Sequence, residues 1–324
     1  MKRRTMTSSK ETRLTRWFGR RPWRSVLRLG SIALGVGATA WLLTVLWPEP
    51  DRVAKDGSDN RDALTSLAPF PSAPVTVLVV GIDADQLGEP SNQAAPLGRA
   101  NADALMLFRI SADEPLQVLQ IPSELAVQLP GNDPPTSLSS LWQSGGVALL
   151  NDAIQDILGS TQQSPQRYVV MPRMALRTVV NGLGDLDLIL NQIYERNDKS
   201  QGYSINLQAG RQRLNGEKAE QFARYRQTPL DNANRRTRQQ SLILALLEQL
   251  KDSSVIATLP SLVNRLESEL DTNLSRPEQL SLAVALMASP PPARITQVPL
   301  AKREGNQILR QVKPGQTLPL WPQD

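Results

Sequence analysis

The chain has 324 residues, a length that suits one large domain or two small ones. It contains no histidine and no cysteine, which excludes Ser-His-Asp triads, histidine-based acid/base catalysis and the usual zinc and redox-metal sites. The net charge of +5 is uneven, because residues 1–28 hold ten Lys or Arg and one acid, so the rest of the chain carries −4. That balance removes the main electrostatic argument for nucleic-acid binding, and we expect no nucleic-acid partner.

An uncharged segment at residues 29–47 predicts a membrane anchor. Its length is close to the roughly 20 residues that cross the hydrocarbon core as a helix. A cleaved signal peptide is the alternative, but the apolar run is longer than a usual signal-peptide core and lacks a small-residue cleavage site. The positive charge of residues 1–28 then places this tail in the cytoplasm and the chain after Pro48 outside. The sequence thus predicts a single-pass protein of the cell (inner) membrane with an extracytoplasmic domain.

The predicted domain covers residues 74–290, between a flexible linker at 48–73 and a C-terminal extension at 291–324. The linker is expected because its stretch is rich in Pro, Asp, Ser and Ala and lacks apolar periodicity. Strands and helices are predicted in the domain without a strict β-α-β rhythm, which indicates an α/β fold with a mixed central sheet and helices on both faces. The strands are expected at 75–83, 102–110, 116–121, 125–129, 167–171 and 186–190, the helices at 145–159, 172–182, 237–251, 258–268 and 276–288, and a final hairpin after Ala293.

Two aspartates mark the ends of the first two predicted strands. Asp83 ends the first strand, and Asp103 lies at the start of the second. Ligands commonly bind where strand ends meet a loop, and two carboxylates there can share one Mg²⁺ with phosphate oxygens of a substrate. The alternative is that each aspartate caps a turn.

Arginines are concentrated around a polar turn between Gly216 and Gln240, which two predicted helices flank. Guanidinium groups from both helices can converge there, and their planar, permanently charged forks suit phosphate oxygens. The alternative is a solvated charged helix face. The six residues are Arg213, Arg224, Arg226, Arg235, Arg236 and Arg238.

An uncharged segment at 136–146 (TSLSSLWQSGG) leads into the predicted helix that follows it. Its glycines and hydroxyls can leave backbone N–H groups available to an anion, although a Gly-Gly pair before a helix is commonly only a turn. Together with the aspartates and the arginines, it indicates a metal-assisted phosphate site that needs no nucleophilic side chain.

These motifs resemble the LytR–CpsA–Psr family of bacterial envelope proteins, from about Val75 to Leu250. VLVVGID stands where the family has a strand ending in Asp, and ADALMLFRI resembles its "SDTMML" strand. IPSELAVQLPG resembles "IPRDTRVEIPG", and SLSSLWQSGG stands where the family has "KINAAYAYGG". The most specific segment is LQAGRQRLNGEKAEQFARYR followed by RRTRQQ.

The resemblance implies a membrane-anchored phosphotransferase. Such an enzyme moves a glycopolymer from a polyprenyl-diphosphate carrier onto a cell-wall acceptor, with Mg²⁺ or another divalent cation at the diphosphate. The metal-linked acids would be Asp83 and Asp103. The catalytic residues would be Asp103, Arg224 and Arg226, and the diphosphate-binding residues Arg99, Arg224, Arg226, Arg235 and Gln239.

Several charged positions of the family pattern are replaced in this chain. Asn101 and Ser123 stand where the family has arginines, Ser137 where it has a lysine, and Asn232 where it has an aspartate, while Glu124 replaces another aspartate. Each lost contact to a charged group is worth roughly 1.5–3 kcal/mol, so several losses can abolish turnover while the fold persists.

Three functional hypotheses follow from these observations. The first is the glycopolymer phosphotransferase, and the second is a catalytically degenerate member that binds a lipid-linked or anionic envelope polymer without turnover. The third, a transcriptional regulator or attenuator, rests on the basic tail alone and lacks a helix-turn-helix signature. Two questions remain open: whether Arg99 or Arg236 replaces a missing arginine, and whether helix 237–251 lines a polyprenyl groove or is ordinary core.

Overall fold

The computed structural model describes residues 57–89, 98–131, 134–159, 165–198, 203–228 and 230–315. The basic tail expected at 1–28 and the membrane helix expected at 29–47 lie outside these residues. Within the described ranges, no helix is both long and apolar enough to span a membrane. The residues from Asn60 onward cluster as one unit, which carries the sheet and the candidate site.

A six-stranded mixed sheet forms the centre of this unit, in the order β11-β6-β1-β2-β3-β12. β1 is antiparallel to β2 and parallel to β6, and β3 is antiparallel to β2 and parallel to β12. The central strands are runs of β-branched and large apolar residues, which pack well on a pleated surface. The strands are β1 (Val75–Ile82), β2 (Ala102–Ile110), β3 (Gln117–Ile121), β6 (Arg167–Met171), β11 (Asp271–Thr272) and β12 (Arg294–Gln297).

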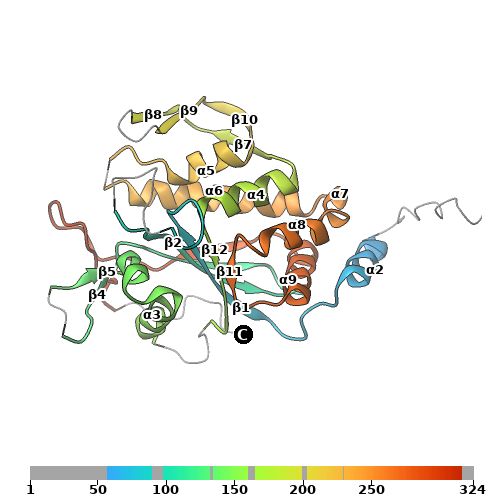
Figure 1. Cartoon of the computed structure of the whole chain (residues 1–324), viewed down its shortest axis with the longest axis horizontal. Helices are drawn as coiled ribbons and strands as arrows, with labels where there is room; N and C mark the ends of the chain where they lie inside the picture. The colour runs from blue at the N-terminus through green and yellow to red at the C-terminus, as the bar shows by residue number, and fades with distance from the viewer. Residues whose placement is uncertain are drawn as a thin grey trace, which may run out of the picture. The chain divides into compact units, whose positions relative to one another are not determined.

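Helices cover both faces of the sheet, as predicted. Successive side chains of a strand point to opposite faces. Leu78 of β1 belongs to a buried cluster with α3 (Leu141–Leu158), and Val77 belongs to a cluster on the other face with α6 (Asn232–Leu250) and α9 (Arg276–Ala288). The mixed α/β architecture with a central mixed sheet is therefore confirmed (Figure 1).

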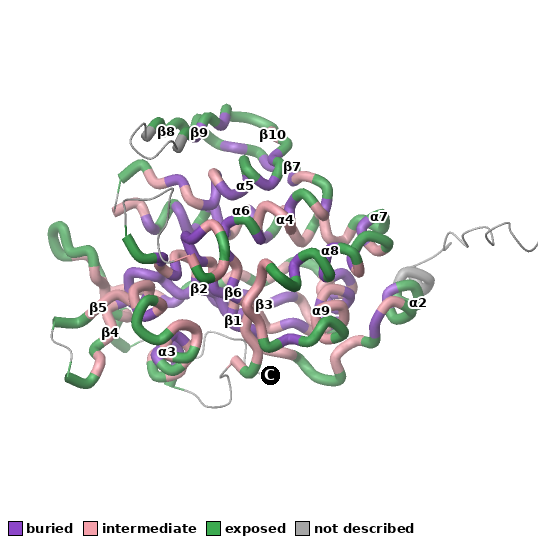
Figure 2. Tube along the Cα trace, in the orientation of Figure 1, coloured by how far each residue is buried: buried purple, intermediate pink, exposed green. Residues whose placement is uncertain are grey.

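The remaining helices pack on the same side of the sheet as α6 and α9. Helix α4 (Arg173–Leu183) is capped at its C-terminus by Gly184, whose left-handed φ of 101° suits glycine there. α9 begins with a capping box, in which Ser275 and Glu278 each bond the other's backbone N–H. The four helices are α4 (Arg173–Leu183), α5 (Gly216–Arg224), α7 (Ser253–Ile256) and α8 (Leu259–Leu266). Buried segments follow the central strands and the inner faces of these helices (Figure 2).

Two small sheets pack against α5 and α6. β7 (Leu186–Leu190) pairs with β10 (Gly210–Leu214), and β8 (Tyr194–Asp198) pairs with β9 (Tyr203–Leu207). They share a buried aromatic cluster with α5, in which the ring of Tyr194 meets two further rings edge-on at 5.1 and 5.3 Å. The β8–β9 hairpin did not emerge from the sequence, because its polar strands lack an apolar run.

The two predicted domain boundaries need correction. Residues 48–73 were expected to be a flexible linker, but residues 57–67 form helix α2 (Gly57–Leu67), whose Leu64 is buried in a core cluster. Residues 291–324 were expected to be an extension, but β12 is an edge strand of the central sheet. The final hairpin is also reduced to a single antiparallel bridge between Leu300 and Val312, because β12 pairs with β3 instead.

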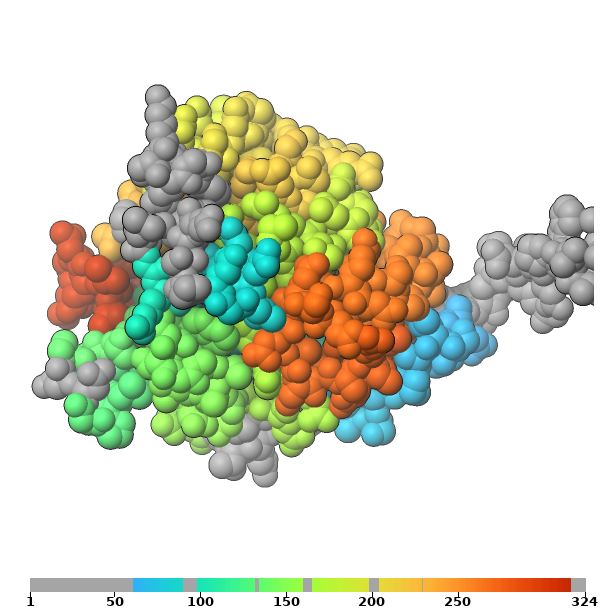
Figure 3. Space-filling view, in the orientation of Figure 1, coloured from blue at the N-terminus to red at the C-terminus, as the bar shows by residue number. Residues whose placement is uncertain are grey.

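A third short ribbon lies beside α3. It consists of β4 (Ala126–Val127) and β5 (Thr136–Ser137), followed by the 3-10 turn η2 (Leu138–Ser140). The face of the molecule in Figure 3 is formed in part by α3, in green, and by α8 and α9, in orange. Gln143 of α3 donates hydrogen bonds to Arg99 and Asn101, so the segment at 136–146 lies beside the start of β2.

Candidate functional site

The two predicted metal-linked aspartates lie at the adjoining ends of β1 and β2. Gly81 pairs with Ala104 and the next residue of β1 pairs with Ala102, so Asp103 is the extra residue of a β-bulge. Bulges commonly redirect a side chain at a functional site. Asp83 is buried and its Oδ1 accepts the backbone N–H of Asn101 at 2.6 Å. The bulge and this hydrogen bond place the two carboxylates at the same end of the two central strands, β1 and β2.

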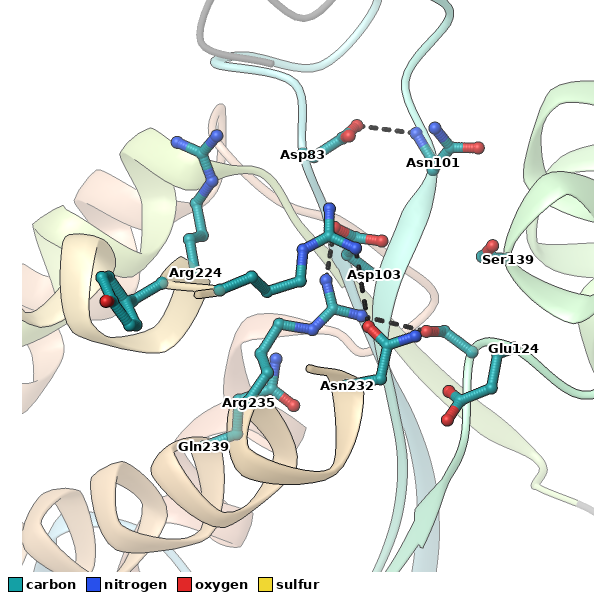
Figure 4. A network of polar contacts seen from close by, with 12 residues as sticks. Asp83, Asn101, Asp103, Glu124, Ser139, Arg224, Asn232, Arg235 and Gln239 are labelled. Atoms are coloured by element: carbon teal, nitrogen blue, oxygen red, sulfur yellow. Dashed lines mark hydrogen bonds and ion pairs between the residues drawn. The ribbon is translucent and has the colours of Figure 1, made fainter. Parts of the chain in front are cut away.

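Arg235 reaches this edge from the first turns of α6. It is 3% exposed, and its Nη1 donates to Oδ2 of Asp103 at 2.7 Å. Its Nη2 donates to the hydroxyl of Ser123 at 3.1 Å, while its buried Nε has no recorded partner in the described part of the chain. A buried nitrogen without a partner is costly, and a bound anion would satisfy it. Figure 4 shows Arg235 and Arg224 coming from different helices toward the strand ends that carry Asp83 and Asp103.

Arg224 and Arg226 supply further positive charge beside Arg235. Arg224 ends α5, and its Nη1 donates to Glu220 at 2.8 Å. Arg226 follows the helix and contacts Asn232 at 3.5 Å. Burial, followed by the charge of Arg235, lowers the pKa of Arg226, although the group remains a cation at neutral pH. Like charges held this close favour a bound anion.

Three of the six arginines do not join this group. Arg236 is buried and donates to both carboxylate oxygens of Glu124 at 2.7 and 2.8 Å. Arg238 stacks over aromatic rings, among them Tyr225 at 5.2 Å. Arg213 is 70% exposed on β10. The predicted convergence therefore applies to Arg224, Arg226 and Arg235, while Arg236 and Arg238 anchor α6.

Arg99 and Gln239 have different positions relative to the site. Arg99 is exposed, does not line the cavity described below, and accepts hydrogen bonds through its backbone carbonyl from Asn101 and Gln143. Gln239 is buried one turn after Arg235 and accepts from Gln120 at 3.2 Å. Gln239 lines the cavity wall beside Asp103 and Arg235. Whether Arg99 contacts a phosphate stays a prediction.

Neutral residues that replace family charges contact the remaining arginines and acids. Ser123 accepts from Arg235, Asn232 from Arg226, and Asn101 holds Asp83 through its backbone. The hydroxyl of Ser137 caps η2 and lies 3.0 Å from that of Ser139. In the described residues, the hydroxyls of the 136–146 segment bond mainly to one another.

A cavity of about 430 Å³ opens beside these charged groups. Its polar end is lined by charged and amide side chains, namely Asp83, Asp103, Arg173, Glu220, Arg224, Arg235 and Gln239. The remainder runs between the sheet and helices α4, α6, α8 and α9 and is lined by apolar side chains. Among these are Met106, Leu176, Leu242, Leu246, Leu262 and Leu286. The combination of a charged end and an apolar interior suits an amphiphile with a charged head and a hydrocarbon chain.

A buried ion cluster in the cavity wall was missed by sequence reasoning. Glu220 of α5 is 1% exposed and accepts hydrogen bonds from Arg173, Arg177 and Arg224. Arg173 also pairs with Asp85, two residues after Asp83. The available signal was helical spacing, since Glu220 and Arg224 are four residues apart on one helix face.

The carboxylate pair suits a hard divalent cation. Mg²⁺ is held in proteins by one or two carboxylates together with water and substrate phosphate oxygens, and Asp83 and Asp103 supply that number. Within the described residues, no cluster of three or more His, Cys, Asp or Glu forms a closed metal cage. Whether these two carboxylates hold a divalent cation stays a prediction.

Comparison with known proteins identifies the family. The LytR_cpsA_psr family model matches residues 52–313. The chain belongs to this family. The match includes α2 and β12, in agreement with the corrected domain boundaries.

Members of the LytR_cpsA_psr family with curated names include two transferases of Bacillus subtilis (strain 168). The polyisoprenyl-teichoic acid–peptidoglycan teichoic acid transferase TagV is 21% identical over 78% of this chain and 63% of its own length. TagT, of the same description, is 28% identical over 64% of this chain and 62% of its own length. The regulatory protein MsrR of Staphylococcus aureus (strain COL) is 22% identical over 62% of this chain and 56% of its own length. The matched region thus spans about three fifths of these relatives.

Solved structures of the family share the fold. The crystal structure of B. subtilis TagV superposes with a TM-score of 0.59 at 19% identity, covering 76% of this chain and 92% of that one. TagT bound to LIIa-WTA superposes with a TM-score of 0.55 at 21% identity, covering 81% and 88%. At these identities the likeness establishes the mixed α/β fold alone.

Proposed function

We propose that this protein is a membrane-anchored phosphotransferase that moves a glycopolymer from a polyprenyl-diphosphate carrier onto a cell-wall acceptor. Residues 29–47 would anchor it in the cell (inner) membrane, with residues 1–28 in the cytoplasm and the domain outside. The transferase names of TagV and TagT support the reaction class. A tethered domain would also meet a lipid carrier at high effective concentration.

One observation carries the proposal: the arginine group opens into an apolar cavity. Arg224 and Arg235 line the polar end of a cavity of about 430 Å³, and apolar side chains line the rest of it. A diphosphate bound at that end could place its attached prenyl chain between the sheet and α6. Each buried CH₂ group of the chain would contribute about 0.8 kcal/mol. Leu242 and Leu246 of α6 line the cavity, so the helix predicted at 237–251 would form one wall of the prenyl groove.

The residues of the site divide the work of phosphoryl transfer. Arg224, Arg226 and Arg235 bind the two phosphates and stabilise the charge that develops during transfer, which is the main contribution proteins make to this chemistry. The acceptor hydroxyl forms a bond to the phosphorus that carries the glycan, the P–O–P bond breaks, and the carrier leaves as a lipid monophosphate. Asp103, held by Arg235, accepts the proton of the hydroxyl.

A divalent cation such as Mg²⁺ would be held by Asp83 and Asp103. When bound, it neutralises charge on the phosphate oxygens. The salt bridge between Arg235 and Asp103 uses Oδ2 of the aspartate, and Asp83 is fixed by the backbone of Asn101. The protein therefore orients both carboxylates before ligand arrives.

The second candidate is a binding protein without turnover. The neutral residues Asn101, Ser123, Ser137 and Asn232 favour it, because they leave fewer charges to stabilise a transition state than the family pattern provides. The three central arginines remain, so affinity for a diphosphate lipid would persist in this case.

The test uses the full-length chain in detergent with a polyprenyl-diphosphate-linked glycan, Mg²⁺ and peptidoglycan fragments. Mass spectrometry follows conversion of lipid diphosphate to lipid monophosphate. Arg226→Ala should lose the activity. Arg211→Ala is the matched control, because Arg211 is 78% exposed on β10, away from the cavity.

The outcomes separate the hypotheses. Product in the wild type and in Arg211→Ala, but not in Arg226→Ala, supports the phosphotransferase. Arg226-dependent lipid binding with no product supports the binding protein. If the wild type neither binds the lipid nor forms product, both hypotheses are refuted.

A further inference from the structure

Glu220 forms the centre of a buried cluster of charges beside the phosphate site. Its Oε1 accepts from Arg173 at 3.0 Å and from Arg224 at 2.8 Å, and its Oε2 accepts from Arg177 at 2.8 Å. The three arginines come from two helices, since Arg173 and Arg177 lie on α4 and Arg224 ends α5. One carboxylate thus fixes the distance between α4 and the arginine that faces the site.

The cluster is costly to maintain for stability alone. Burial acts to raise the pKa of the Glu220 carboxyl, but Arg224 and then Arg173 outweigh it, and the pKa lies below its usual value. The carboxylate is therefore ionised at neutral pH, in a cavity wall that it shares with Arg173, Arg224 and many apolar side chains. Buried ion clusters of this kind are seldom more stabilising than well-packed apolar residues. A role beyond packing would explain its presence here.

The cluster also joins the two halves of the proposed site. Arg173 pairs with Asp85, and its backbone N–H donates to the carbonyl of Ala84 at 3.0 Å. These residues directly follow Asp83, the proposed metal ligand. The chain of contacts therefore runs from the carboxylate loop through Arg173 and Glu220 to Arg224.

The cluster carries surplus positive charge. Arg173, Arg177 and Arg224 outnumber the carboxylates of Asp85 and Glu220 by one, and Arg226 adds another cation nearby. A guanidinium group is always charged, so this surplus cannot be relieved by proton loss. Without the carboxylate of Glu220, three guanidinium groups would repel one another, and Arg224 would lose its ion pair with Glu220.

We propose that Glu220 is a positioning residue that holds Arg224 toward the diphosphate and couples it, through Arg173, to the loop that carries Asp83. The inference rests on the proposed function, because the diphosphate is the ligand of that site. Glu220 itself touches the arginines and not the reacting atoms.

The experiment measures binding of inorganic pyrophosphate to the full-length protein by isothermal titration calorimetry. Glu220→Gln keeps the shape of the side chain and removes its charge. We expect its dissociation constant to rise about tenfold or more, the scale of a hydrogen bond to a charged group. Glu220→Asp, which keeps the charge, should recover part of the affinity. Glu217→Gln is the matched control, because Glu217 lies exposed in the first turn of the same helix, and it should bind as the wild type does.

A purely structural role would lower the thermal midpoint without changing the affinity of the folded protein. If Glu220→Gln fails to fold, Arg173→Met/Glu220→Leu replaces the pair by apolar side chains of similar length and should show the same loss of affinity. Affinity within twofold of the wild type in the folded variant would overturn the inference. The proposed function fails separately, if the wild type itself does not bind pyrophosphate or if Arg226→Ala binds equally well.

Discussion

The ion pair between Glu124 and Arg236 gives the sharpest test of how α6 is held in place. Both side chains are almost fully buried, and Nη1 of Arg236 lies 2.7 and 2.8 Å from the two carboxylate oxygens. Gln297 of β12 accepts from Nε of the same arginine at 3.2 Å. Glu124→Ala would leave a buried guanidinium group without its counter-ion. Removing one partner of a buried ion pair lowers the free energy of unfolding by roughly 3–5 kcal/mol.

This cost converts into a large thermal shift. The melting temperature of a domain of this size falls by roughly 2–4 °C for each kcal/mol lost from the free energy of unfolding. Glu124→Ala should therefore melt about 6–20 °C below the wild type in a thermal scan followed by circular dichroism. Glu124→Leu/Arg236→Met should regain most of this loss, because replacing both partners removes the unpaired charge. The double variant should also bind pyrophosphate within twofold of the wild type, since Arg236 faces Glu124 and not the cavity. A shift under 2 °C in Glu124→Ala, or a double variant no more stable than the single one, would refute this reasoning.

Three further predictions concern other parts of the fold. Gly216→Ala should destabilise by about 1–3 kcal/mol in urea unfolding, because a Cβ atom there would lie 2.4 Å from the carbonyl oxygen of Arg177. Hydrogen bonds from Ser275, first from its backbone, hold the pKa of Glu278 at about 2. A carboxyl group whose pKa is lowered by folding stabilises the fold at a pH above its ordinary pKa, near 4.5. This contribution should fade as the pH falls from 4.5 to 2. Glu278→Gln should therefore melt at a lower temperature than the wild type at pH 7 but not at pH 2. Leu246→Trp should obstruct the cavity, so that two or three CH₂ groups of a long-chain lipid diphosphate can no longer be buried. The KM for this lipid should then rise about tenfold or more, while the affinity for pyrophosphate stays unchanged.

The central sheet could be predicted from the sequence because its strands are long apolar runs. Residues 75–83 and 102–110 carry few polar side chains, and the observed β1 and β2 agree with them within one residue. The edge strands of the sheet were harder to predict. β12 (Arg294–Gln297) has an exposed, mostly polar pattern, and its partner β3 lies far away along the chain, so its place in the sheet depends on tertiary pairing. α2 was missed because a single buried face, around Leu64, stabilises an otherwise polar helix.

The site could be predicted in part. The sequence predicted that Asp103, Arg224 and Arg235 lie together, and the structure brings them to one cavity, while their roles stay a prediction. Spacing could not separate Arg235 from its neighbour Arg236, since successive helical residues point about 100° apart and only the packing of α6 decides which one faces the cavity. Glu220 was missed for a related reason, because its partners on α4 are more than 40 residues distant.

The replaced family positions change the charge of the site without leaving its arginines disordered. Ser123 gives Arg235 an acceptor where a second arginine would have repelled it, and Asn232, which stands where the family has an aspartate, gives Arg226 a neutral acceptor. Asn101 contributes its backbone N–H to Asp83, a contact that any residue type can provide. Arg226 is thus held by a neutral partner, whereas Arg235 and Arg224 also form ion pairs with Asp103 and Glu220. Binding of a diphosphate then depends on the three arginines already in place, and turnover depends on whether Asp103 can accept a proton while it is paired with Arg235.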